Sequence, residues 1–71
     1  MITMMEPGRQ CRVTGNSPTQ IEDELSTAVV LIHQHAHEVR HGILVTRLDP
    51  GTYTVALDPA VPYGMTDERD T

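Results

Sequence analysis

The sequence predicts an α+β fold in which one long amphipathic helix is followed by an antiparallel β-hairpin, an α-β-β order that homodimerisation completes. Three observations support this fold. Helix start and stop signals enclose an apolar stripe, the apolar period changes from about 3.6 residues to about 2 after Gly42, and the core of one copy is small. These features divide the chain into a flexible N-terminal arm (1–15), a domain of helix plus β-hairpin (16–60) and an acidic C-terminal tail (61–71).

The predicted helix has clear signals at both ends. Ser17 is suited to cap the first turn, Pro18 to occupy the first helical position and Gln20 to complete a capping box. Gly42 can adopt the left-handed conformation that ends a helix, so we expect about 24 helical residues and a length of about 36 Å. The apolar residues recur at helical spacing, which places on one face Ile21, Leu25, Ala28, Ile32 and Val39.

Two segments rich in β-branched and apolar residues follow, 43–48 (ILVTRL) and 52–57 (TYTVAL). Between them, Pro50 fixes φ and Gly51 accepts positive φ, which favours a tight turn. A loop of even length gathers the apolar side chains on one face, and the register follows the face that must be buried. The predicted pairs are Leu48–Tyr53, Thr46–Val55 and Leu44–Leu57.

A single helix and hairpin would leave part of the core exposed. A helix of about 36 Å lies against strands of about 20 Å, so roughly a third of its apolar stripe extends beyond the hairpin. Ordering the backbone costs about 1–2 kcal/mol per residue, so a domain with so small a core has only marginal stability. We therefore expect a homodimer. The alternatives are a marginal monomer that adds Val61 and Tyr63 to its core, or a chain that folds only on a different partner.

The composition argues against several classes of function. The net charge is −5, with ten acidic residues, five arginines and no lysine, so we expect no binding to nucleic acid or to anionic membranes. The longest strongly apolar run, 28–32, is far too short to span a membrane. The first residues do not resemble a secretory signal, and the single Cys11 cannot form an internal disulfide, which favours a cytoplasmic protein.

Four histidines fall within HQHAHEVRH, residues 33–41. His37, Glu38 and His41 match the His-Glu-x-x-His pattern, in which two imidazoles on one helical face bind zinc and the glutamate handles a proton of the bound water. No histidine follows as a third ligand, and the chain is too short to form a substrate cleft. A zinc hydrolase of this type is therefore the least favoured function.

A ladder of His33, His37 and His41 along the helix is the better candidate for a metal site. Adjacent histidines could chelate Zn²⁺, Ni²⁺ or Cu²⁺, most completely where two subunits contribute ligands. The alternative, which we favour, is a solvated polar face that holds no cofactor. His35 projects instead onto the edge of the apolar stripe, either as a neutral core residue or as a pH-sensitive one whose protonation loosens the assembly.

The function that the sequence favours is a small acidic, non-enzymatic protein-interaction or regulatory module that acts as a homodimer on another protein. We find no phosphate-binding loop, no nucleophile with a base and no paired-carboxylate cleft in the sequence, so we expect no enzymatic activity. The candidate contacts with the unidentified partner are an exposed strand edge and the segment that contains Val61, Tyr63 and Met65. A transition-metal-binding or sensing module that uses the histidine ladder is the alternative.

Overall fold

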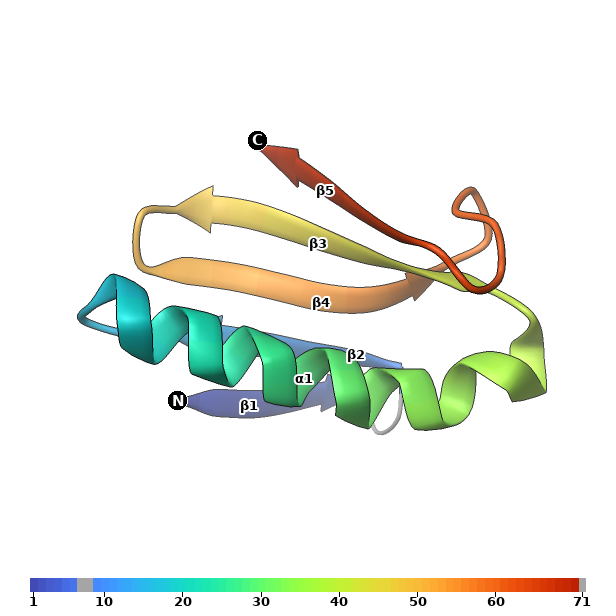
Figure 1. Ribbon diagram of the computed structural model, residues 1–71, viewed down its shortest axis with the longest axis horizontal. Helices are drawn as coiled ribbons and strands as arrows, with labels where there is room; N and C mark the ends of the chain where they lie inside the picture. The colour runs from blue at the N-terminus through green and yellow to red at the C-terminus, as the bar shows by residue number, and fades with distance from the viewer. Residues whose placement is uncertain (7–8, 71) are drawn as a thin grey trace.

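The computed structural model describes residues 1–6 and 9–70, which form two layers: one helix lies on one face of a five-stranded sheet (Figure 1). The elements, in chain order, are β1 (Ile2–Glu6), β2 (Gln10–Thr14), α1 (Pro18–Val39), β3 (Gly42–Asp49), β4 (Thr52–Asp58) and β5 (Thr66–Asp70). The strand order across the sheet is β1-β2-β4-β3-β5. β3 and β5 are parallel and the other neighbours are antiparallel, so β2 and β3 run in the same direction on either side of β4.

The predicted α-β-β fold is wrong, because three further strands join the hairpin in one mixed sheet. β2 lies between β1 and β4, where Cys11 and Val13 alternate with polar residues and are fully buried. β5 pairs with β3 through its backbone, although its sequence TDERD contains no apolar residue. The helix consequently packs on β2, β4 and β3 rather than on a hairpin alone. The added strands provide a wider apolar surface beneath α1 than the predicted hairpin would.

The helix begins where the sequence predicts but ends earlier. Ser17 Oγ accepts a hydrogen bond from the backbone N–H of Gln20 at 3.2 Å, and Pro18 opens the helix. At the other end Arg40, and not Gly42, adopts the left-handed conformation (φ 60°), and its N–H donates to Ala36 O at 2.8 Å. Gly42 instead begins β3, where the neighbouring backbone approaches too closely for a side chain.

The predicted turn is present, but the predicted register is wrong by one residue. Gly51 N–H donates to Asp49 Oδ1 at 2.9 Å, which closes the tight turn through Pro50. A β-bulge between Arg47 and Asp49 adds Leu48 to one strand, and an extra residue reverses which side chains face the core. The observed pairs are Arg47–Tyr53, Val45–Val55 and Ile43–Leu57.

The core lies between α1 and one face of the sheet. Its buried residues are Cys11, Val13, Ala28, Ile32, Ile43, Val45 and Val55. The observed register places Leu44 on the opposite face of the sheet, and Leu48, the unpaired residue of the bulge, is 43% exposed. No helix of the described residues is long and apolar enough to span a membrane.

Candidate functional site

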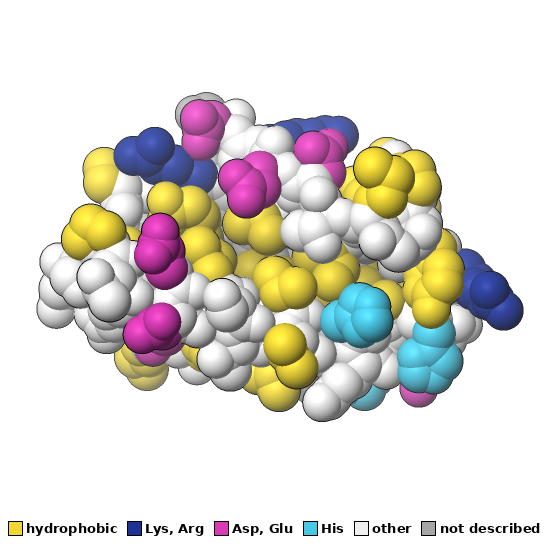
Figure 2. Space-filling model, viewed as in Figure 1, with side chains coloured by type: hydrophobic (Ala, Val, Ile, Leu, Met, Phe, Trp, Pro, Cys, Tyr) yellow, Lys and Arg dark blue, Asp and Glu magenta, His cyan; other side chains and the backbone are white. Residues whose placement is uncertain are grey.

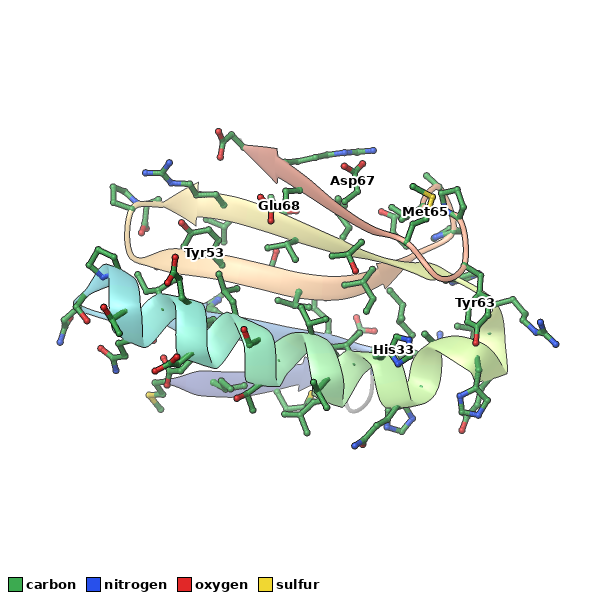
Figure 3. All side chains as sticks on the ribbon, viewed as in Figure 1. His33, Tyr53, Tyr63, Met65, Asp67 and Glu68 are labelled. Atoms are coloured by element: carbon green, nitrogen blue, oxygen red, sulfur yellow. The ribbon has the colours of Figure 1, made fainter. Side chains whose placement is uncertain are left out.

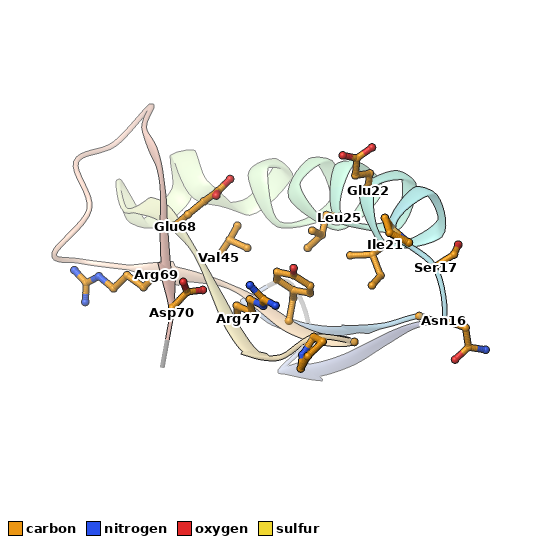
Figure 4. A pocket seen from close by; sticks show the side chains of 15 residues that line it. Asn16, Ser17, Ile21, Glu22, Leu25, Val45, Arg47, Glu68, Arg69 and Asp70 are labelled. Carbon is orange, nitrogen blue, oxygen red and sulfur yellow. The ribbon is translucent and has the colours of Figure 1, made fainter.

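A groove runs between α1 and β5 on the helix side of the sheet (Figure 4). A helix is about 10 Å wide and neighbouring strands lie about 4.8 Å apart, so one helix covers only part of a five-stranded sheet. The uncovered part lies over β3 and β5, and the resulting groove has a volume of about 1020 Å³. A second hollow, of about 290 Å³, is smaller.

The groove has an apolar floor and acidic walls. Val45 of β3 and Tyr53 of β4 form the floor, and Leu25 of α1 borders it. Glu22 stands on the helix wall and Glu68 on the β5 wall. Figure 2 shows this combination as hydrophobic side chains exposed along the hollow, with acidic side chains on both sides of it. A partner with an apolar face and flanking positive charge would match both properties.

The parallel pairing of β5 with β3 determines which acidic side chains enter the groove. Ile43 N–H donates to Met65 O at 2.9 Å, which fixes the start of the pairing. Paired residues of neighbouring strands share a face, and the register pairs Val45 with Glu68 and Arg47 with Asp70. Glu68 therefore faces the groove (Figure 3), whereas Asp67, which pairs with Leu44, lies on the opposite face of the sheet.

Two arginines also line the groove, but they differ in position. Arg47 lies at the end of the groove nearest the β3–β4 turn, close to Pro50 and Gly51 of that turn. Arg69 pairs with Thr46, and its side chain points away from the groove in Figure 4. Acidic side chains thus predominate along the middle of the groove, and the arginine that faces it lies near one end.

The structure does not bring His33, His37 and His41 into a single ladder. His33 and His37 are exposed on α1. His41 follows the end of the helix, so it does not lie one turn below His37; it lines a second hollow of about 290 Å³ with Glu6 and Arg9. No group of three His, Cys, Asp or Glu residues in the described chain is arranged to hold a metal ion. His35, which we expected at the edge of the core, is exposed.

The three residues proposed to contact a partner fall into two environments. Val61 is only 3% exposed, and it holds the β4–β5 connection against Gly42. Tyr63 and Met65 are exposed, and the Arg40 guanidinium carbon lies 5.6 Å from the centre of the Tyr63 ring (Figure 3). Tyr63 and Met65 are thus accessible to a partner protein, whereas Val61 is part of the packed interior.

The two edges of the sheet have different chemistry. β5 presents three carboxylates and one arginine in five residues, whereas Glu6 is the single charged side chain of β1, and Met4 and Met5 are exposed. Thr14 N–H donates to Met1 O at 2.8 Å. Met1 and Thr14 are therefore a hydrogen-bonded pair, and bonded and non-bonded pairs alternate along an antiparallel ladder. Ile2 and Met4 consequently belong to non-bonded pairs, and their N–H and C=O groups point away from β2. β1 is therefore an open edge with little charge to prevent further pairing.

The sequence did not predict the groove, because the residues of its β5 wall were assigned to the acidic C-terminal tail. The alternation in TDERD, with Thr66, Glu68 and Asp70 at every second position, was the available signal. It did not indicate a strand, because none of these residues is apolar. Cys11 was also missed as a core residue; burial raises the pKa of its thiol, which makes it a poor nucleophile.

Comparisons with protein-family models, with curated proteins and with solved structures give no match. No family activity can therefore be carried over to this chain. The chemistry of the groove and of the β1 edge is the basis of the proposals that follow.

Proposed function

We propose that this protein is a small non-enzymatic interaction module that dimerises through β1 and binds another protein. The observation that carries the proposal is the contrast between the two sheet edges: β5 is strongly acidic, whereas β1 has exposed methionines and outward-directed backbone groups. Unpaired N–H and C=O groups at a sheet edge readily pair with another strand. Charged edge residues oppose such pairing, so β1 is the favoured edge.

A two-fold axis through Thr3 would satisfy the open backbone groups of β1. In an antiparallel pairing of two copies, Ile2 of each copy lies opposite Met4 of the other, and these residues carry the outward N–H and C=O groups. The two sheets then form one continuous sheet with both helices on the same face. This arrangement leaves the groove of each copy open at the far edge, beside β5, for another protein.

The chemistry of the groove supports binding rather than catalysis. Among the described residues that line it there is no histidine or cysteine. Ser17 is the one serine of the lining, and its hydroxyl oxygen accepts the N–H of Gln20 as a helix cap. A groove with an apolar floor and charged walls is typical of a surface that recognises another protein.

Sedimentation velocity over a concentration series tests the dimer. We expect wild-type protein to sediment as a dimer and Met4→Pro to sediment as a monomer, because proline removes an N–H that faces away from β2 and leaves the β1–β2 hydrogen bonds in place. Met4→Val is the matched control, since it alters the side chain but keeps the N–H, and it should remain a dimer. Circular dichroism establishes that the proline variant is folded.

Two results would contradict this proposal. A wild-type protein that stays monomeric at every concentration overturns the homodimer, and a folded Met4→Pro variant that still dimerises overturns the β1 edge as its interface. A second experiment tests binding to another protein. The dimer and the monomeric variant are each used to capture proteins from a cell extract, and the amount of protein captured is compared with the amount of each bait. We expect the dimer to retain the captured protein more strongly, because two linked sites raise the effective affinity.

A further inference from the structure

We propose that the groove between α1 and β5 binds one amphipathic α-helix of a partner protein, with its apolar face on Val45 and Tyr53 and basic residues along its flanks. This inference rests on the proposed interaction function and names the class of its partner. The bound helix would complete the layer that α1 begins on this face of the sheet.

The dimensions of the groove favour a helix over an extended segment. Helices lying side by side on a sheet are about 10 Å apart, which corresponds to about two strands, and the part of the sheet beside α1 is formed by β3 and β5. The floor is a sheet face, formed by the side chains of Val45 and Tyr53, and not a strand edge. Extended peptides gain most from backbone pairing at an edge, whereas a helix packs its apolar stripe on a sheet face.

The charges on the walls favour a basic partner. Glu22 on one wall and Glu68 on the other place carboxylates on both sides of the apolar floor, whereas Asp70 lies beside Arg47, with which it pairs. A helix that lies between them has its flanks next to both walls, so lysine or arginine at these flanks would meet opposite charge. Arg47 stands near one end, at the β3–β4 turn, and leaves the middle of the groove acidic.

A second copy of this chain is a poor occupant of the groove. The apolar stripe of α1, with Ile21, Ile32 and Ala36, is already buried on its own sheet. The exposed residues of its first turns include Glu22 and Asp23, which would meet the carboxylates of the groove. The occupant must therefore bring both a free apolar stripe and positive charge, which indicates a different protein.

Titration of labelled wild-type protein with synthetic helical peptides tests this inference. The probe is an amphipathic peptide of about 14 residues, roughly 21 Å long, with leucines on one face and lysines along both flanks. The matched peptide has the same leucines and glutamate in place of lysine. We expect the lysine peptide to bind more tightly at physiological salt. Side-chain chemical shifts should change at Val45 and Tyr53 and not at Leu44 or Thr54, whose side chains lie on the opposite face.

Two variants of β5 separate binding in the groove from general attraction to an acidic protein. Glu68→Lys and Asp67→Lys change the net charge equally and lie on one exposed strand, but on opposite faces of the sheet. We expect Glu68→Lys to weaken binding of the lysine peptide by about threefold or more, and Asp67→Lys by less than about twofold, because exposed charges are screened beyond about 8 Å.

The outcomes distinguish this inference from the function on which it rests. Equal effects of the two variants, tighter binding of the glutamate peptide, or shifts on the opposite face each overturn the basic helix as occupant of the groove. If the dimer forms and captures a protein while neither peptide binds, the inference fails and the proposed function stands. If the protein is a monomer that captures nothing, the proposed function fails, whatever the peptides do.

Discussion

Replacing Gly42 with alanine should destabilise this protein strongly, although the sequence around Gly42 does not indicate this. A Cβ atom at this position would lie 2.4 Å from Val61 Cγ1 and 2.4 Å from Pro62 O, against an ordinary contact of about 3.4–4 Å. The backbone cannot separate freely, because Gly42 N–H donates to Val61 O at 2.8 Å. The 61–62 segment must therefore move by about 1 Å, which weakens that hydrogen bond at a cost of about 1 kcal/mol.

The same movement lifts Val61, which is buried, out of its place in the interior. Partial loss of its packing adds about 1–2 kcal/mol, so we expect Gly42→Ala to lower the free energy of unfolding by about 2–3 kcal/mol. For a chain of this size the melting temperature should fall by roughly 10 to 20 °C. Urea unfolding followed by circular dichroism measures the first quantity and a thermal scan the second.

Gly64→Ala is the matched control for this prediction. Gly64 has φ +90° but nothing within 4 Å of the added Cβ, so its substitution should cost only the backbone strain, about 1–2 kcal/mol. Because the side chain of Val61 is one of the two groups that clash, the double variant Gly42→Ala, Val61→Ala should cost less than the sum of its single changes. A Gly42→Ala variant no less stable than Gly64→Ala would refute the steric reasoning.

Three further predictions concern the core, the helix cap and the histidines. Burial raises the pKa of the Cys11 thiol above its ordinary 9.0, so this thiol ionises at lower pH in the unfolded state than in the folded state. The free energy of unfolding should therefore decrease as the pH rises above about 9. Cys11→Ala should lack this decrease, and a wild-type free energy that does not change with pH in this range would contradict the prediction. Ser17→Ala should cost about 1 kcal/mol in urea unfolding, because it removes the oxygen that accepts the Gln20 N–H; Ser26→Ala on the exposed helix surface is the control and should change little. Stoichiometric Zn²⁺ should change the melting temperature by no more than about 1 °C, because the described residues bring no three metal ligands together. A larger increase that His37→Ala abolishes would contradict this prediction and support a metal site on the helix.

Local signals in the sequence were sufficient for the start of the helix and for the hairpin turn. Ser17 and Pro18 act within one turn of the helix, and Asp49 and Gly51 within one tight turn, so each needs no information from distant residues. The predicted register failed because the bulge at Leu48 is a single extra residue. Such an insertion changes the facing of every side chain before it, while the apolar composition of the strand stays the same.

The strands outside the hairpin could not be predicted, because they form by pairing with residues distant in the sequence. β2 becomes a strand because β1 and β4 pair with it on both sides, and five residues with two buried side chains give only a weak periodic signal. β5 is polar throughout, and its pairing with β3 comes from backbone groups that sequence patterns do not reveal. The groove could not be predicted for the same reason, since Glu68 reaches it only through that pairing.

The central position of β4 also determines the order in which this chain can fold. β2 and β3 are parallel and are joined by α1, but they are not neighbours in the sheet. β4, which comes later in the chain, pairs with both of them and lies between them. The sheet cannot be completed until β4 pairs with both β2 and β3, and Val55 enters the core at that step. During synthesis β1, β2 and α1 emerge before β4, the strand that joins them to β3. Folding of the whole chain awaits the emergence of Thr52–Asp58 from the ribosome.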